Sequence, residues 1–167
     1  MLNFKTLYER YSSDVYRFAL WLTGDKDEAE DITSETFIRA WVHVKKIRAK
    51  TLRAYLLTIA RNTYFEQQRN RNRQVALDDN FPDPAPQPGK QVEVQIELKG
   101  IREYLWSLPK IDRVVFVLRV QYEMPYSEIA QVMNISITSA KVKVHRIRKK
   151  LLAARTAKEA LHYESHT

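Results

Sequence analysis

The chain has 167 residues, of which 44% are hydrophobic and 29% charged, a balance typical of a globular protein with one domain or two compact halves. It has no cysteine and 3 glycines, which excludes disulfide frameworks, cysteine-ligated zinc, thiol catalysis and a glycine-rich phosphate loop. The N-terminal residues hold no apolar stretch of signal-peptide length, and the longest apolar run, 114–118, is too short to cross a bilayer. We therefore expect a soluble, cytoplasmic protein that does not insert into membranes.

The net charge of +8 comes from two separate basic blocks. Residues 43–73 carry nine basic residues against Glu66 alone, and residues 137–155 carry seven basic residues and no acidic one. One such block can be a solvated helix face, but a cluster is also typical of a protein with a polyanionic partner. Two blocks in separate halves of the chain favour nucleic acid as that partner.

Apolar residues recur at helical spacing through the first half of the chain. They predict one helix over 4–22, a second over about 25–44, and a third that starts near Leu52 and continues through 69–73, after a basic loop at 43–51. The first two helices are expected to bury Phe4, Leu7, Tyr8, Tyr11, Val15, Phe18, Ala19, Leu22, Ala29, Ile32, Thr33, Thr36, Phe37, Ala40, Trp41 and Val44.

Residues 78–90 hold 4 of the 6 prolines and show no apolar period, which predicts an extended spacer. Beyond it, apolar stripes predict two further helices, over about 94–108 and 110–118, and no strand alternation of useful length occurs anywhere. The predicted fold class is all-α, with two small helical domains joined by a Pro-rich linker.

Residues 125–151 carry the pattern of a helix-turn-helix. Ser127 is expected to cap a short helix, Asn134 to form the turn, and Ser136 to cap a second helix. The second helix would bury Ile137, Ala140, Val144, Ile147 and Leu151. Its outer face would carry Lys141, His145 and Arg148, flanked by Thr138, Val142, Lys143, Arg146 and Lys149. Such a helix fits the major groove of DNA, whereas the simpler alternative is a helical hairpin with a cationic surface.

Three stretches resemble the extracytoplasmic-function (ECF) sigma factors of bacterial RNA polymerase, within the sigma-70 family. AEDITSETFIRAW, at 29–41, is similar to the family's region 2.2, and YLLTIARN, at 55–62, is similar to its region 2.3. The segment from Leu108 through the helix-turn-helix to Leu151 is similar to region 4. The resemblance implies a region 2-like domain over 1–75, a linker over 76–92, a region 4-like domain over 93–155 and a tail over 156–167.

The resemblance implies a sigma factor that binds core RNA polymerase, directs it to promoters and helps to initiate transcription. Binding to a coiled coil of the largest polymerase subunit would involve Glu28, Asp31, Glu35 and Arg39. Binding to the minus-ten promoter element would involve Lys45, Lys46, Arg48, Lys50, Arg53, Arg61, Asn62 and Arg69. Binding to the minus-thirty-five element would involve Thr138, Ser139, Lys141, Val142, His145, Arg146 and Lys149. Further partners implied are the flap of the second largest subunit and an anti-sigma factor.

The chain departs from the family pattern at several positions. The loop after Trp41 lacks the common Phe-Arg-Gly-Asp-like element, so no residue is assigned to capture a flipped base. Two alternatives remain from the residues themselves: a free-standing helix-turn-helix regulator, and a nucleic-acid-cleaving enzyme that uses the acidic second helix. We expect no enzyme, metal site or cofactor, because no nucleophile, base and orienting group can be assembled.

Overall fold

The computed structural model describes residues 3–43, 51–77 and 96–164, and these ranges contain seven α-helices and no strand. The all-α prediction is therefore confirmed, while the predicted spacer at 78–90 lies outside the described residues. The chain divides into two compact units, Met1–Val92 and Glu93–Thr167. No helix in the described part combines the length and the apolar character needed to span a bilayer.

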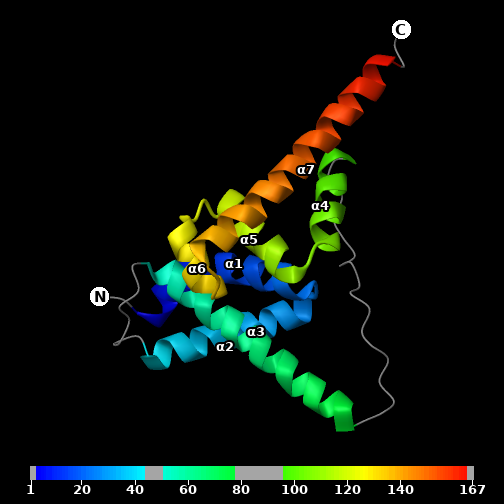
Figure 1. The fold of residues 1–167 in the computed structure, drawn as a ribbon. Coiled ribbons are helices and arrows are strands. Elements are labelled where there is room, and N and C mark those ends of the chain that lie inside the picture. Colours follow the sequence, from blue (N-terminus) through cyan, green and yellow to red (C-terminus); the bar gives the residue numbers. More distant parts are fainter. Residues whose placement is uncertain (1–2, 44–50, 78–95, 165–167) are drawn as a thin grey trace. The chain divides into compact units, whose positions relative to one another are not determined.

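The first unit is a three-helix bundle (Figure 1). Its helices are α1 (Phe4–Thr23), α2 (Lys26–His43) and α3 (Leu52–Leu77), and each contacts the other two. Gly24 ends α1 in the left-handed conformation, with φ 69°, and its N–H donates to the carbonyl of Leu20 at 2.8 Å. Asp25 then starts α2, because its Oδ1 accepts from the backbone N–H of Glu28 at 2.9 Å. The sharp Gly24–Asp25 turn sets α2 antiparallel to α1.

Most of the predicted apolar stripe forms the core of this unit, but Tyr11 is only half-buried, and Val44 lies outside the described residues. Three further predicted core residues are exposed. Phe18 and Leu22 of α1 are buried, but Phe4, Tyr8 and Trp41 are exposed by 39%, 43% and 43%. These rings lie along the edge between α1 and α2 and pack on one another, with Phe4 and Trp41 centroids 5.6 Å apart. The prediction that they are buried was wrong, because helical spacing identifies the face of a helix but not how far its neighbours cover that face.

The second unit consists of α4 (Ile96–Ser107), α5 (Lys110–Val120), α6 (Tyr126–Met133) and α7 (Ile137–Glu164). Helices α5, α6 and α7 contact one another, and α4 contacts α5. Their core is mainly aliphatic and consists of Leu105, Val114, Val115, Phe116, Val117, Leu118, Tyr122, Met124, Ile129, Ala130, Val132, Met133, Ala140, Val144 and Ile147. Helices α6 and α7 form the predicted helix-turn-helix.

The turn between α6 and α7 has the geometry that its sequence predicted at Asn134. Asn134 is left-handed, with φ 55° and ψ 50°, and the backbone N–H of Ile135 donates to the carbonyl of Ala130 at 3.1 Å. The hydroxyl of Ser136 accepts from the N–H of Ser139 at 3.0 Å and so caps α7, as predicted. The turn therefore fixes where the second helix begins.

The predicted helix-turn-helix differs from the structure at its first cap and in its buried stripe. The N-cap of α6 is Pro125, two residues before the expected Ser127, and its carbonyl accepts from the backbone N–H of Ile129 at 3.0 Å. Two residues expected in the buried stripe are not buried: Ile137 is 45% exposed, and Leu151 is half-buried. Ile137 is the first residue of α7, and the core stripe begins one turn later at Ala140.

We expect Asn134→Val to destabilise the second unit by about 1–2 kcal/mol, because a β-branched residue is strained in the left-handed region. Denaturant unfolding of the full chain measures the change. Asn134→Gly is the matched control and should retain the stability of the native chain within a few tenths of a kcal/mol, since Asn134 is exposed and glycine tolerates this conformation. Equal stability of the Val and Gly variants would contradict this account of the turn.

Candidate nucleic-acid and polymerase interfaces

The first turns of α7 present a basic surface that is held in place by a small aliphatic seam. Ala140 and Val144 are fully buried, and Ile147 is 3% exposed. The opposite side of the helix is exposed at Thr138, Lys141, Val142, His145, Arg146 and Lys149, while Ser139 is half-buried. We call these seven residues the α7 basic face. All seven were predicted to contact the minus-thirty-five element, and the structure places them together on one accessible surface.

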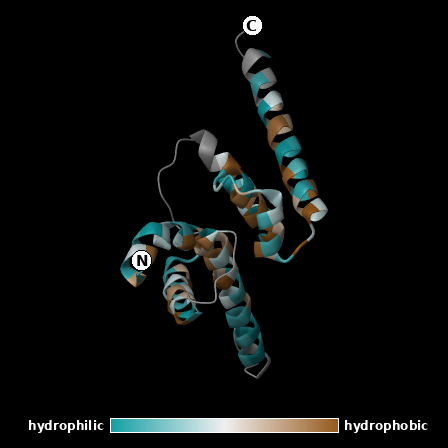
Figure 2. Cartoon of the chain, turned by 90° about the vertical axis from the view of Figure 1, so that its left-hand side faces the viewer, coloured by the Kyte–Doolittle hydropathy of each residue, from teal (hydrophilic) through white to brown (hydrophobic). Residues whose placement is uncertain are grey.

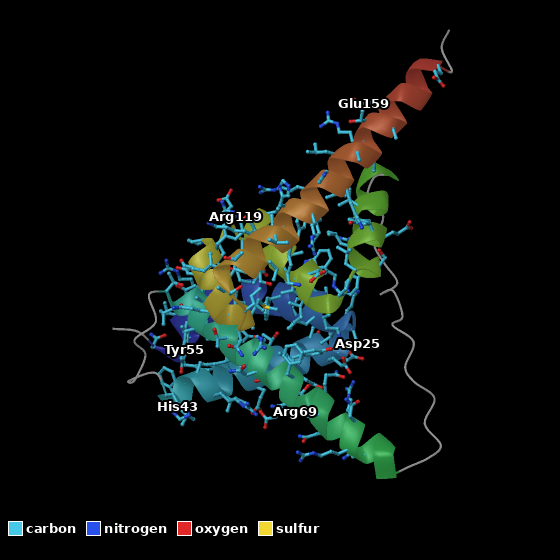
Figure 3. The ribbon with its side chains drawn as sticks, in the orientation of Figure 1. Asp25, His43, Tyr55, Arg69, Arg119 and Glu159 are labelled. Atoms are coloured by element: carbon cyan, nitrogen blue, oxygen red, sulfur yellow. The ribbon has the colours of Figure 1, made fainter. Side chains whose placement is uncertain are left out.

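A further cation that the sequence did not predict lies beside this face: Arg119, near the end of α5, labelled in Figure 3. Its guanidinium carbon lies 4.4 Å from the ring centroid of Tyr126. Its Nη1 donates to the carbonyl of Met124 at 3.1 Å, and Nζ of Lys141 lies 5.9 Å from the same ring. Arg119 and Lys141 therefore share one aromatic neighbour. Sequence spacing could not bring them together, because the turn between α5 and α6 decides where Arg119 lies.

Lys143 is the exception among the basic residues of α7. Its side chain is 25% exposed, and its ammonium forms an ion pair with the carboxylate of Asp112, in the first turn of α5. The expectation that Lys143 flanks the outer basic face was therefore wrong. It lies three residues after Ala140 and four before Ile147, so it borders the buried seam.

The acidic side of α2 is joined to α3 by ion pairs. Arg39 donates from Nε to Glu35 Oε1 at 2.7 Å and from Nη1 to Glu66 Oε2 at 2.9 Å. Glu28 pairs with Arg71 of α3. Of the four residues predicted to bind polymerase, Glu28, Glu35 and Arg39 are thus already engaged within the unit, whereas Asp31 is exposed on α2.

The pairing with Arg39 changes the acidity of Glu66. Hydrogen bonding to the Arg39 guanidinium, aided by its charge, lowers the pKa of Glu66 below the ordinary value of 4.5. The same bond raises the pKa of Arg39. A lowered carboxyl pKa contributes stability above pH 4.5, and this contribution is lost as the pH falls through the lower pKa of the folded state.

We therefore expect Glu66→Gln to lower the stability of the chain at neutral pH and to make less difference in acid. The measurement is the free energy of unfolding of both chains at about pH 7 and about pH 3. Glu9→Gln, which removes an exposed carboxylate from α1, controls for the loss of one surface charge. If the difference in free energy of unfolding between the native and Glu66→Gln chains is the same at both pH values, the stabilising ion pair between Glu66 and Arg39 is contradicted.

The residues predicted to contact the minus-ten element are only partly described. Lys45, Lys46, Arg48 and Lys50 lie outside the described residues, whereas Arg53, Arg61, Asn62 and Arg69 lie on α3. Asn62 and Arg69 are exposed, and Arg53 and Arg61 are half-buried. The second half of α3 is largely hydrophilic (Figure 2), as expected for a helix that continues beyond the core into the basic run 69–73.

Arg61 has an unusual environment within α3. Its guanidinium carbon lies 4.8 Å from the ring centroid of Phe65, and its Nη1 donates to Asn62 Oδ1 at 3.0 Å. Within the described part of the chain, its buried Nε has no hydrogen-bond partner. Burial lowers the pKa of Arg61, although a guanidinium remains charged at neutral pH. The side chain is therefore held against Phe65 and presents one end of its guanidinium near Asn62.

The described residues contain no group of three or more His, Asp or Glu side chains placed to hold a metal ion. Of the acidic side chains of α2 that suggested a cleaving enzyme, Glu35 pairs with Arg39 and Glu28 pairs with Arg71, whereas Asp31 is exposed. The charged surfaces of the described residues are one basic face on α7, one basic helix, α3, and one acidic helix, α2.

Comparison with known proteins agrees with this geometry in both units. The family model "Sigma-70 region 2" matches residues 7–74, and "Sigma-70, region 4" matches residues 98–151. The ECF RNA polymerase sigma factor SigM of Bacillus subtilis is 34% identical over 152 residues, which cover 88% of this chain and 91% of that protein. SigL of Mycobacterium tuberculosis is 29% identical over 145 residues, which cover 84% of this chain and 82% of that protein.

Among solved structures, the sigma factor RpoE of Bartonella quintana, in complex with the anti-sigma factor NepR, matches with a TM-score of 0.72 and 26% identity. The match covers 89% of this chain and 93% of that one. Both halves of the chain therefore match the same kind of protein, in the order that the sequence predicted. The chain belongs to the ECF sigma factors of bacterial RNA polymerase, a branch of the sigma-70 family.

Proposed function

We propose that each unit of this sigma factor binds a different part of polymerase and a different promoter element. The first unit binds the coiled coil of the largest polymerase subunit through α2 and contacts the minus-ten element through α3 and the segment before it. The second unit binds the flap of the second largest subunit and contacts the minus-thirty-five element through the α7 basic face. The chain acts by binding and is not itself an enzyme.

One observation supports the assignment to duplex DNA most directly. The α7 basic face is exposed while Ala140, Val144 and Ile147 anchor the same turns in the core. A helix anchored in this way can enter the major groove, where Lys141, Val142, His145 and Arg146 would lie against base edges and phosphates. Arg119, held beside Lys141 by Tyr126, would extend this contact to the DNA backbone.

The contacts proposed for the minus-ten element are electrostatic and local to α3. Asn62 and Arg69 are exposed, and Arg61 is held against Phe65 beside Asn62, so this part of α3 offers cations together with an aromatic ring. Cations and aromatic rings are what proteins use to hold unpaired strands. Lys45, Lys46, Arg48 and Lys50 would add charge from the segment that precedes α3.

The contact proposed for polymerase rests on the acidic charge of α2. Asp31 is free to face a partner, while Glu28, Glu35 and Arg39 would contribute only where a partner competes with their pairing to α3. A further proposed partner is an anti-sigma factor, because the similar sigma factor RpoE was solved in complex with the anti-sigma factor NepR.

Co-elution of the chain with purified bacterial core polymerase, followed by run-off transcription from a pool of genomic fragments, tests this function. We expect a stable complex that starts transcription at discrete sites, and the sites reveal the promoter sequence. Absence of a complex, together with tight duplex binding by the free chain, would instead indicate a free-standing regulator.

A further inference from the structure

Lys143 differs from the other basic residues in the first turns of α7 because it is half-buried at the border of the seam and pairs within its own unit. Its ammonium and the carboxylate of Asp112 pair between α7 and α5, and the two side chains are only 25% and 28% exposed. Lys141, His145, Arg146 and Lys149, by contrast, are exposed. An ion pair shielded from water to this degree is more directional than the exposed pairs on the surface.

The partner of Lys143 stands on a helix that is itself held in place. Asp112 lies in the first turn of α5, where the unpaired backbone N–H groups favour a carboxylate. The next residue, Arg113, is 5% exposed, and its guanidinium carbon lies 4.1 Å from the ring centroid of Trp106 on α4. The start of α5, which carries the carboxylate that pairs with Lys143, is therefore held against α4 by the neighbouring residue.

Packing of the seam fixes which side of α7 is buried, because Ala140, Val144 and Ile147 are all at most 3% exposed. Individual van der Waals contacts are weak, so a polar contact at the border of the seam can still adjust the rotation of the helix. A hydrogen-bonded ion pair at the border of this seam does have a preferred direction. It can therefore set the angle at which the α7 basic face meets a ligand.

We propose that Asp112 and Lys143 form a positioning pair that sets the rotation of α7 about its axis and so determines which base edges Lys141, Val142, His145 and Arg146 contact. Lys143 acts through this pair and does not contact a phosphate. The inference rests on the proposed function of the second unit, since it concerns how that unit selects a minus-thirty-five sequence.

The test uses holoenzyme assembled from the full chain and bacterial core polymerase, with promoter duplexes in which the minus-thirty-five positions are randomised. The variants are Lys143→Met, which keeps most of the side-chain length, and Asp112→Asn. Asp112→Lys and Lys143→Asp are tested singly and together, the double variant being the exchanged pair. Lys149→Met is the matched control for loss of an exposed cation from α7. Each holoenzyme is scored for its preference among sequences and for the salt dependence of promoter binding.

A correct base pair is typically preferred over a wrong one by about 5- to 150-fold, and we expect Lys143→Met and Asp112→Asn to reduce this preference about threefold or more. Lys143→Met should leave the salt dependence unchanged, whereas Lys149→Met should lower its slope by about 1 and leave sequence preference intact. The exchanged pair should recover preference relative to either of its single substitutions. A loss of stability alone would weaken binding to all sequences equally, so it would not change the preference.

Two results would overturn the inference. The first is unchanged sequence preference in the Lys143→Met and Asp112→Asn holoenzymes while native holoenzyme is selective. The second is a salt slope lowered by about 1 in Lys143→Met, which would make Lys143 a phosphate contact. A native holoenzyme with no preference at these positions would instead refute the proposed function of the second unit, and the inference with it.

Discussion

Holoenzyme that carries Lys141→Ala together with Arg146→Ala should lose transcription from its promoter by about tenfold or more. Both side chains are exposed on the α7 basic face, and the seam of Ala140, Val144 and Ile147 that holds α7 in the unit is left intact. A specific side-chain contact to a base edge contributes about 1–3 kcal/mol, so the loss of two such contacts should lower the affinity for the promoter by more than tenfold. Run-off transcription at fixed salt measures the effect.

The same variant should bind core polymerase as well as the native chain does, because the substitutions do not touch α2. Arg155→Ala is the matched control: it removes an exposed cation from the same helix, one that pairs with Glu159 beyond the helix-turn-helix. This control should transcribe normally. Equal loss of transcription in both variants, or loss of polymerase binding by the double variant, would refute the assignment of the α7 basic face to DNA.

Asp31→Lys should weaken binding to core polymerase by about tenfold or more, since like charges placed across an interface cost several kcal/mol. Asp31 is the most direct test among the predicted polymerase contacts because it is exposed on α2. Substitutions of Glu28, Glu35 or Arg39 would also break pairs between α2 and α3 or within α2. Gel filtration of chain and core polymerase at several concentrations measures the change in affinity.

Glu9→Lys is the control for reversing one exposed acidic charge on the same unit, and it should bind polymerase normally. Circular dichroism should show native helix content for both variants, because neither position is buried. Normal polymerase binding by the Asp31→Lys chain would show that the docking surface lies elsewhere on the first unit.

The sequence predicted the helices and the helix-turn-helix well because these features depend on local patterns. Helical spacing of apolar residues identified the buried side of α7 from Ala140 onward, and Asn134 and Ser136 occupy the turn and cap positions that their chemistry favours. The start of α6 was predicted less well, because Ser127 and Pro125 are both suitable N-terminal residues. Pro125 is the N-cap because its carbonyl accepts the first bonds of the helix.

Contacts between helices could not be predicted from spacing. Glu28 meets Arg71, and Asp112 meets Lys143, across separations along the chain that only the packed fold brings together. For this reason the sequence grouped Lys143 with the outer cations of α7. The exposure of Phe4 and Trp41 depends likewise on how far neighbouring helices extend, which no local pattern encodes.

Site-specific photocrosslinking in an assembled promoter complex tests the central claim most directly. A photoreactive phenylalanine replaces His145 in one chain and Asp31 in another, both exposed positions. The account predicts that position 145 crosslinks to duplex DNA at the minus-thirty-five element and that position 31 crosslinks to the largest polymerase subunit. Crosslinks from position 145 to protein alone, or from position 31 to DNA, would contradict the division of work between the two units.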